Sequence, residues 1–295
     1  MTQTGTIRAD GASLYYERRG SGPALLMISG GGADAGYYSQ VAETLADAYT
    51  VLTYDRRGNS RSTVDDPAAM LRIEQQSADA LAVLAHHDLA SALVFGSSGG
   101  ALIGLDLTAQ HTAVVDGLVA HEPPILSLLT DTERALFAEI AEILRREGPW
   151  PAFLRFITTI DRPDSPAVVR NRLGRRLLAG LMHIGQRLVV HGPRSLREKN
   201  RFMGNAEYLM TREMAPFLAF NPDCDALTNS AIPIIIGVGA LSRTYYAGRA
   251  ADALAARLNV PVAEFPGSHA GYTKQPEPFA TTLRTVLARL RQSAP

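Results

Sequence analysis

The feature that most constrains the fold is a Gly-x-Ser-x-Gly sequence at residues 96–100, between two apolar segments. The preceding segment, 91–95, has the length of a strand, and the following one, 101–109, has the periodicity of a helix. A sharp turn from strand to helix strains the central residue, exposes its side chain and excludes a Cβ atom at the flanking positions. Because glycines flank it, we predict that Ser98 is a nucleophile. A flexible loop has a similar composition, and the position between strand and helix argues against it.

Apolar runs of strand length alternate with helical segments through much of the chain. We expect two short strands joined by a turn at Asp10-Gly11, and then strands at 24–28, 50–54, 91–95, 117–121, 233–238 and 262–265. We expect helices at 38–48, 73–86, 101–109, 247–258 and 279–291. This alternation predicts an α/β fold with a mostly parallel central sheet and helices on both faces.

The alternation stops between residues 123 and 226, where helical, arginine-rich segments replace the strands. We expect breaks between these helices at Gly148-Pro149, Pro163, Gly192-Pro193 and Pro216. Because strands resume afterwards, we predict one core domain, 1–122 and 227–295, with a helical cap inserted at 123–226. We do not expect the insertion to form an independent domain.

The charge balance and cysteine content exclude several classes of function. The 295 residues hold 29 Lys+Arg and 29 Asp+Glu, so no global field attracts nucleic acid or an anionic membrane. The single cysteine, Cys224, excludes an internal disulfide framework and a cysteine-based zinc site. We find no apolar run of signal-peptide or membrane-spanning length. We therefore expect a cytoplasmic protein with no metal or organic cofactor, no nucleic acid partner and no membrane partner. A homodimer is compatible with the sequence, which leaves the oligomeric state open.

A serine hydroxyl becomes nucleophilic when a nearby base accepts its proton. His269 is the best candidate, because it follows the last strand and should emerge at the same sheet edge as Ser98. The base needs a carboxylate that fixes its tautomer. Glu122 directly follows the strand at 117–121, so we predict that it has this role. The alternative for Glu122 is a surface carboxylate at the start of the insertion.

A tetrahedral intermediate also needs hydrogen-bond donors for its oxyanion. The backbone N–H of Gly99 opens a helix, and the turn Gly30-Gly31-Gly32 follows the strand at 24–28. We predict an oxyanion hole formed by the amides of Gly31 and Gly99.

Taken together, these motifs resemble the α/β-hydrolase-fold serine hydrolases over essentially the whole chain outside the insertion. The segment 55–62, Asp-Arg-Arg-Gly-Asn-Ser-Arg-Ser, is similar to a family motif that follows the second parallel strand, with one position altered. The segment 266–269, Pro-Gly-Ser-His, is similar to the loop that carries the family's catalytic histidine. The order Ser98, Glu122, His269 is also the order of the family's triad.

The predicted triad acid, Glu122, does not occupy the sequence position that is usual in the family. Most members carry it after the strand that follows the cap, but residues 237–243 contain no carboxylate here. Some members carry it after the preceding strand, where Glu122 stands. Asp223 and Asp225, which precede the strand at 233–238, are weaker substitutes.

The resemblance implies a serine hydrolase that cleaves a carboxylic ester or related acyl bond of a small, largely apolar molecule. We expect Tyr37, Tyr38, Phe95, Trp150 and Phe217 to line its substrate pocket. The same fold also hosts lyases, cyclases, cofactor-free oxygenases and ligand-binding pseudoenzymes, so a non-hydrolytic role is the alternative.

A minor alternative is an NAD(P)-dependent oxidoreductase. Residues 30–35 match the pattern G-x-G-x-x-A after a strand, and Asp55 ends the next strand at the spacing of a ribose-binding acid. A hairpin precedes the glycine-rich strand, however, and this hypothesis leaves Ser98 and His269 without a role.

Overall fold

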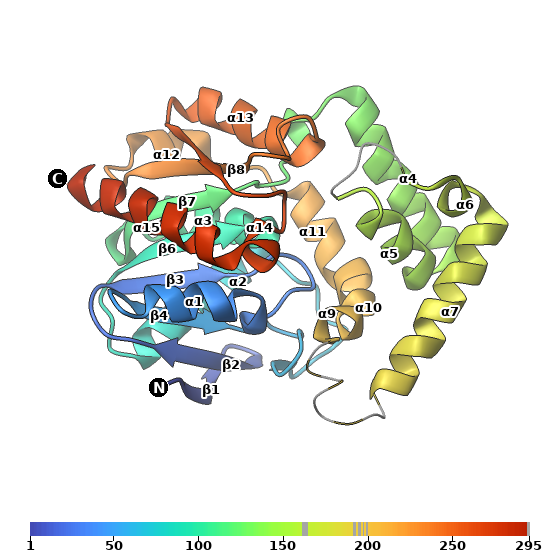
Figure 1. Ribbon diagram of the computed structural model, residues 1–295, viewed down its shortest axis with the longest axis horizontal. Helices are drawn as coiled ribbons and strands as arrows, with labels where there is room; N and C mark the ends of the chain where they lie inside the picture. Colours follow the sequence, from blue (N-terminus) through green and yellow to red (C-terminus); the bar gives the residue numbers. More distant parts are fainter. Residues whose placement is uncertain (161–164, 191–192, 194–195, 197, 199, 294–295) are drawn as a thin grey trace.

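A single mixed sheet organises the chain (Figure 1). The computed structural model describes residues 1–160, 165–190, 193, 196, 198 and 200–293. The sheet order is β1-β2-β4-β3-β6-β7-β8-β9, with β5 paired to β2. The strands are β1 (Gln3–Ala9), β2 (Ala12–Arg19), β3 (Ala24–Ile28), β4 (Thr50–Tyr54), β5 (Thr63–Val64), β6 (Ala92–Ser97), β7 (Val115–His121), β8 (Ile234–Gly239) and β9 (Val262–Phe265).

The predicted α/β class with a mostly parallel sheet is confirmed. β1 and β2 form the expected antiparallel hairpin, whose turn has Gly11 at φ 68°. From β4 to β9 each neighbouring pair on the sheet path is parallel. β3, β4 and β6 are buried at every residue, because helices cover both faces and the strands need apolar side chains on each side.

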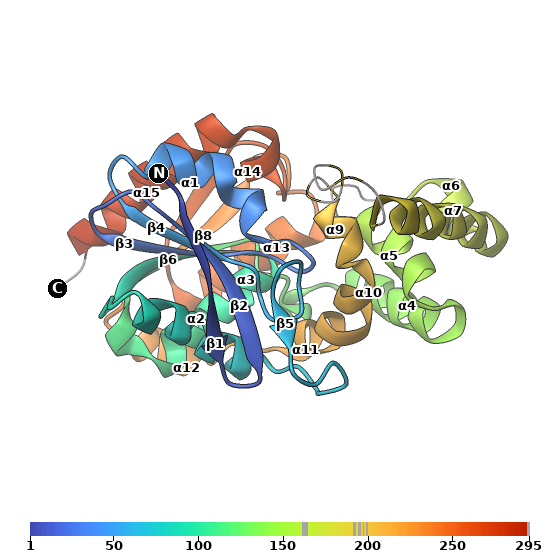
Figure 2. The same cartoon turned by 90° about the horizontal axis from the view of Figure 1, so that it is seen from below.

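Two helical layers cover the sheet (Figures 1 and 2). Side chains alternate along each strand, so that Leu25 packs on one layer and Leu26 on the other. The layer beneath Leu25 contains α1 (Ser39–Leu45) and α15 (Pro276–Ser293). The opposite layer contains α2 (Ile73–His86), α3 (Gly99–Gln110), α12 (Cys224–Asn229) and α13 (Tyr246–Leu258). The short helix α14 (Gly271–Lys274) follows β9.

Between β7 and β8 the described residues form helices and no strand; we call residues 123–226 the helical insertion. It extends from one end of the sheet in both views (Figures 1 and 2), and its hydrophobic core also includes Tyr246, Ala247 and Ala250 of α13. Its helices are α4 (Asp131–Glu147), α5 (Pro149–Ile157), α6 (Ala167–Arg170), α7 (Arg172–Val190), α9 (Arg201–Gly204), α10 (Ala206–Tyr208), a π-helical turn (Leu209–Glu213) and α11 (Met214–Ala219). The expected end of the insertion, residue 226, falls inside α12, whose Leu227 packs in the core of the sheet.

The expected breaks have different outcomes. Gly148 ends α4 with φ 91°, and Pro149 begins α5, where its missing N–H costs no hydrogen bond. The break at Pro216 is wrong, because Pro216 lies in the first turn of α11, directly after the π-helical turn. The π-helical turn directly before α11 departs from the regular i→i−4 hydrogen bonding, which a proline without an N–H would otherwise interrupt. Pro163 and Gly192 lie outside the described residues.

Two features are absent from the described residues. No helix in this part of the chain combines the length and apolarity needed to cross a bilayer. Nor does it hold a group of three or more His, Cys, Asp or Glu side chains that is placed to bind a metal ion.

Candidate active site

Ser98 lies at the turn from β6 into α3, at the carboxyl edge of the sheet. Its backbone has φ 55° and ψ −123°, which L-residues rarely adopt, and its N–H donates to the His121 carbonyl oxygen over 2.9 Å. A Cβ atom on Gly96 would lie 2.3 Å from the Gly100 carbonyl oxygen, and one on Gly100 would lie 2.1 Å from the Ile28 carbonyl oxygen. The flanking glycines are therefore required by close backbone contacts.

His269 and Glu122 meet at the same sheet edge. Nδ1 of His269, in the loop after β9, lies 2.6 Å from Oε2 of Glu122, which follows β7. Glu122 is fully buried, and His269 is 8% exposed. A proton on Nδ1 that is donated to Glu122 leaves Nε2 as the acceptor of the ring. His269 and Ser98 line one cavity, so the geometry suits a base beside a hydroxyl.

The Glu122 carboxylate is held from the neighbouring strand. The backbone of Glu122 has φ 48°, and its N–H donates to the Gly237 carbonyl oxygen over 3.0 Å. Oε1 accepts the N–H of Gly239 over 2.7 Å, and a Cβ atom on Gly239 would lie 3.0 Å from the same oxygen. Burial alone would raise the pKa of Glu122. The His269 hydrogen bond, the charge of the nearby histidines and the Gly239 amide outweigh burial and lower this pKa to about 2. The carboxylate therefore stays ionised at neutral pH.

The glycine turn after β3 approaches Ser98 closely. A Cβ atom on Gly30 would lie 3.0 Å from Cβ of Ser98, and Gly31 and Gly99 both line the cavity. Within the described parts of the chain, neither the Gly31 nor the Gly99 amide donates a hydrogen bond to another residue. Both N–H groups remain available to a ligand beside Ser98.

A buried ion pair between Arg56 and Glu213 holds this glycine turn. Their side chains are 1% and 0% exposed and contact each other directly. Arg56 donates to the Gly30 carbonyl oxygen over 2.8 Å, and Glu213 accepts the Gly32 N–H over 3.0 Å. Asn59 adds a donor to Glu213 over 2.8 Å. Since Glu213 belongs to the π-helical turn, this network joins the helical insertion to the turn beside Ser98.

A cavity of about 330 Å³ lies between the sheet edge and the helical insertion. Its wall is mainly apolar and aromatic, and includes Phe137, Phe156, Phe202, Leu209, Met214 and Phe217. Among the described residues, no Asp, Glu, Lys or Arg side chain lines it. A wall of this kind accommodates an uncharged, largely apolar molecule, because a charged group would lose its hydration without gaining a partner.

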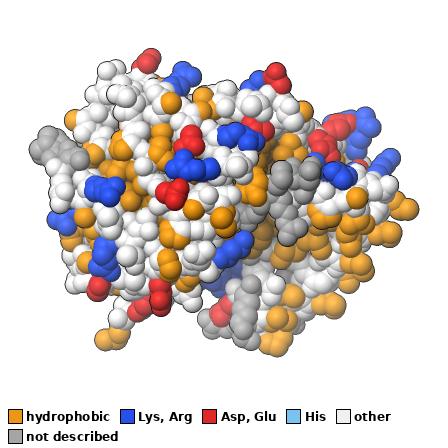
Figure 3. Space-filling view, turned by 45° about the horizontal axis from the view of Figure 1, so that its top comes forward, with side chains coloured by type: hydrophobic (Ala, Val, Ile, Leu, Met, Phe, Trp, Pro, Cys, Tyr) orange, Lys and Arg blue, Asp and Glu red, His pale blue; other side chains and the backbone are white. Residues whose placement is uncertain are grey.

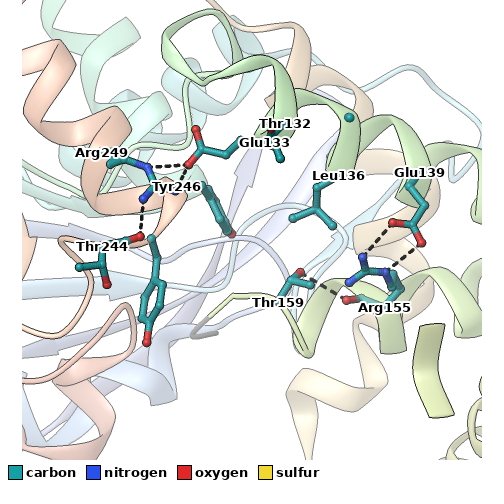
Figure 4. A pocket seen from close by; sticks show the side chains of 11 residues that line it. Thr132, Glu133, Leu136, Glu139, Arg155, Thr159, Thr244, Tyr246 and Arg249 are labelled. Carbon is teal, nitrogen blue, oxygen red and sulfur yellow. Dashed lines mark hydrogen bonds and ion pairs between the residues drawn. The ribbon is translucent and has the colours of Figure 1, made fainter. Parts of the chain in front are cut away.

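A second cavity, of about 470 Å³, lies between α4, α5 and α13 and shares Tyr246 with the first (Figure 4). Arg249 pairs with Glu133, and Arg155 pairs with Glu139 over 2.8 Å, so these charged groups neutralise each other in pairs. The pairs hold the helices together across this cavity.

Comparison with known proteins identifies the family. A family model described as the alpha/beta hydrolase fold matches residues 23–158. YraK of Bacillus subtilis (strain 168), named an uncharacterized hydrolase, is 34% identical over 290 residues, which cover 97% of this chain and 96% of YraK. The chain belongs to the α/β-hydrolase family.

Two further comparisons give this α/β hydrolase its structural and sequence context. The solved enol-lactonase of Burkholderia xenovorans LB400 superposes with a TM-score of 0.70 at 18% identity, over 96% of this chain and all (100%) of that one, and so shares the fold. The zearalenone hydrolase of Bionectria ochroleuca is 29% identical over 140 residues, 46% of this chain and 53% of its own length.

Two of the five residues expected in the substrate pocket of this α/β hydrolase line the cavity. These are Tyr37 and Phe217. The predictions for Tyr38, Phe95 and Trp150 are wrong, because none of them lines the cavity.

Each of the three packs inside the protein instead. Tyr38 is fully buried and donates its hydroxyl to a β3 carbonyl oxygen over 3.1 Å. Phe95 is a β6 residue that faces the α15 layer and packs edge-on against Phe279 at 5.8 Å. Trp150 stacks on His183 at 4.9 Å within the insertion. Aromatic content alone did not distinguish a cavity wall from a core.

The alternative acids do not reach His269, which pairs with Glu122. Asp223 and Asp225 are exposed on α12, where Asp223 accepts the Ala226 N–H over 2.9 Å as the N-cap. Most α/β hydrolases carry their acid directly after the strand equivalent to β8, but here the last residue of β8, Gly239, contributes its amide to Glu122 instead.

The dinucleotide hypothesis conflicts with the position of Asp55. This residue is fully buried, and it accepts the Ala35 N–H over 2.9 Å and the Arg61 guanidinium over 2.7 Å. Its oxygens are therefore already bonded inside the protein and are not available to a ribose hydroxyl.

Glu213 was not predicted from the sequence. A local signal existed, because Glu213 is a lone acid between Leu209, Met210, Met214 and Phe217, at a spacing that places a carboxylate on an apolar face. Such a residue needs a buried cation, and Arg56 supplies it from 157 residues away in the sequence.

Proposed function

We propose that this α/β hydrolase cleaves a carboxylic ester, or a related acyl bond, of a small and largely apolar molecule. The observation that carries the proposal is the 2.6 Å hydrogen bond between His269 Nδ1 and Glu122 Oε2 beside an apolar cavity that Ser98 also lines. Two relatives of the chain, YraK and the zearalenone hydrolase, are named hydrolases, which agrees with this chemistry.

In the first step, Oγ of Ser98 attacks the carbonyl carbon and Nε2 of His269 accepts the hydroxyl proton. Glu122 keeps the other ring proton on Nδ1 and stabilises the imidazolium that forms. Its depressed pKa, about 2, supports this role, because the carboxylate remains negative while the ring becomes positive.

The carbonyl oxygen becomes negative in the tetrahedral intermediate. We assign its stabilisation to the amide N–H groups of Gly31 and Gly99, which line the cavity beside Ser98. The imidazolium then gives its proton to the leaving alcohol, and an acyl group remains on Ser98. Water, deprotonated by His269, attacks this acyl-enzyme and releases the acid.

We assign the helical insertion the role of a cap. It supplies most of the apolar cavity wall, and its Glu213 bonds to the turn that carries Gly31. Excluding water from the cavity strengthens each hydrogen bond to the developing oxyanion.

The test of the proposal is hydrolysis of p-nitrophenyl acetate and butyrate by the wild type, Ser98→Ala and Ser97→Ala. We expect Ser98→Ala to lower kcat by at least about 10⁴-fold, the usual loss of a nucleophile. Ser97→Ala is the matched control, since the neighbouring serine faces His121 and should keep kcat within about ten-fold. Equal, negligible rates in all three proteins would favour a non-hydrolytic member of the fold.

The wall of the cavity predicts a charge preference. p-Nitrophenyl butyrate and the p-nitrophenyl hemiester of succinic acid have acyl chains of similar length, and only the second carries a carboxylate. We expect kcat/KM to be about 100-fold or more lower for the hemiester, because no lysine or arginine among the described lining residues can pair with it. Comparable kcat/KM values would contradict an apolar substrate class.

A further inference from the structure

Helix α7 carries a row of large apolar side chains that face solvent. They are Leu173, Leu177, Leu181, Ile184 and Leu188, and they are 69%, 62%, 66%, 59% and 71% exposed. These five make up almost half of the eleven large hydrophobic side chains that are exposed in the described residues. A contiguous apolar surface that is exposed to solvent in this way marks an interaction site. We call this row the α7 stripe.

The opposite face of α7 packs firmly against the rest of the helical insertion. Arg175 is buried and pairs with Glu147 of α4 over 2.6 Å. Ala179 is 1% exposed in the core of the insertion, and His183 stacks on Trp150. The helix is thus anchored on one side and apolar on the other.

The location of α7 leaves the stripe accessible. Both ribbon views place α7 at the end of the molecule farthest from the sheet (Figures 1 and 2). Hydrophobic side chains gather at that end of the space-filling view, on its right (Figure 3). Beside the stripe, Gly180 and Gly185 leave open space where a side chain would stand, so another helix can approach closely.

The spacing of the stripe is symmetric about its own midpoint. Reversing the direction of the helix about the point between Gly180 and Leu181 exchanges Leu173 with Leu188 and Leu177 with Ile184. Leu181 is exchanged with Gly180, so a large side chain faces a small one at the centre. An antiparallel copy of the same helix therefore presents an apolar partner at each of these levels.

We propose that two copies of the chain associate through α7, antiparallel and around a two-fold axis that passes between Gly180 and Leu181. Burying a leucine removes on the order of 100 Å² from water, so ten such side chains contribute about 1,000 Å². The helix backbone and the flanking side chains bring the total to the lower end of the range for specific interfaces, about 1,200 Å². A second copy is thus sufficient to cover the stripe.

The charged flank of α7 predicts how salt affects the pairing. Arg176 and Arg187 lie on one flank of the stripe, and antiparallel pairing brings the flanks of both copies together. Arg172 lies farther around the helix and pairs with Glu147 over 3.8 Å. Repulsion between exposed like charges changes an equilibrium constant by only about two-fold per pair, and salt screens it. Association of two copies therefore strengthens as the salt concentration rises. Attachment to an anionic lipid surface would weaken instead.

Sedimentation velocity of the full-length chain over a range of concentrations and salt tests the proposal. We expect the dissociation constant of the wild-type dimer to be lower at 500 mM than at 50 mM NaCl. The Debye length falls from roughly 14 Å to roughly 4 Å between these concentrations, so the repulsion is screened. Leu177→Glu combined with Leu181→Glu should raise the dimer dissociation constant by more than about 100-fold, because each charge occurs twice in a symmetric interface. Leu241→Glu is the control, since Leu241 is 65% exposed outside the stripe and should leave the dimer unchanged. The double variant should keep the circular dichroism spectrum and the ester hydrolysis rate of the wild type. Its loss of dimer is then not caused by unfolding or by loss of the active site.

Cysteine cross-linking tests the antiparallel geometry. In a Cys224→Ser background, Leu181→Cys should form a covalent dimer on oxidation, because the two copies of residue 181 lie next to the axis. Leu173→Cys should not, since its copies are about 22 Å apart along an antiparallel pair. Equal cross-linking at both positions would overturn the antiparallel pairing. A wild type that stays monomeric, or that binds vesicles of phosphatidylglycerol in place of itself, would overturn the proposal as a whole.

Discussion

At the scale of single residues, two of the three proposed catalytic residues have a strained backbone conformation. Ser98 has φ 55° and Glu122 has φ 48°, and both come directly after parallel neighbouring strands. In each case the N–H donates to a carbonyl oxygen of the next strand, His121 for Ser98 and Gly237 for Glu122. These sheet hydrogen bonds help to offset a backbone cost of about 1–3 kcal/mol per residue. The strained residues are thereby held with their side chains at the sheet edge.

The Glu122–His269 contact predicts the effect of Glu122→Gln. The amide nearly preserves the shape of the side chain but removes the negative charge, so the ring is no longer held with its proton on Nδ1. We expect kcat for p-nitrophenyl butyrate to fall by about 10³- to 10⁴-fold. Glu122→Asp keeps the charge and should retain more activity than Glu122→Gln. Activity of Glu122→Gln within ten-fold of the wild type would show that the base needs no carboxylate.

At the scale of secondary-structure elements, the glycine turn after β3 is fixed from two sides. Arg56, just after β4, donates to the carbonyl oxygens of Gly30 and of the preceding Ser29. Glu213, in the π-helical turn, accepts the Gly32 N–H. Removing one partner of a buried ion pair leaves the other charge unpaired, which typically costs 3–5 kcal/mol. The position of the Gly31 amide therefore depends on a side chain from the helical insertion.

Glu213→Gln tests this coupling, and Glu147→Gln is its matched control. Glu147 also forms a buried pair, with Arg175, but that pair lies in the insertion away from the cavity. We expect both variants to lower the melting temperature. Only Glu213→Gln should lower kcat more than it changes KM, because an oxyanion donor acts mainly in the transition state. The same loss of kcat in both variants would attribute the effect to stability alone.

Local sequence patterns predict some features of the fold and of the candidate site but not others. The strands and the positions of Ser98, Glu122 and His269 follow from local patterns, because parallel strands bring their carboxyl ends to one edge. The cavity wall does not, since an aromatic side chain in either element is compatible with a core or a pocket. Only the folded chain shows that Phe95 of β6 packs on the α15 layer and that Phe217 of α11 faces the cavity. The role of Arg56 depends on a contact with Glu213 that no local pattern defines.

At the scale of the whole molecule, the buried His121 links stability to pH. It is surrounded by aromatic rings, and its Nδ1 lies 3.1 Å from Oγ of Ser97. Burial lowers the pKa of His121 to about 4. Unfolding exposes the ring and returns its pKa to about 6.5. The unfolded chain therefore binds one more proton between these two values, and the folded state loses stability as pH falls from about 6.5 to about 4.

Urea unfolding between pH 4 and pH 7.5 measures this dependence. We expect the contribution of His121 to the slope to approach 1.4 kcal/mol per pH unit, the value for one proton. His121→Phe fits the aromatic surroundings and should remove that contribution. A residual slope should remain from His87, whose pKa burial also lowers to about 4. Identical slopes in the wild type and His121→Phe would show that His121 is not the group that titrates.

The central claim is that Ser98 is the nucleophile, and covalent labelling tests it most directly. Diethyl p-nitrophenyl phosphate reacts with an activated serine to give a stable phosphoryl-enzyme, which peptide mass spectrometry locates. We predict a single adduct, on Ser98, that forms in parallel with the loss of esterase activity and is absent from Ser98→Ala. Complete inactivation with the adduct on another residue, or full activity of Ser98→Ala, would contradict the account.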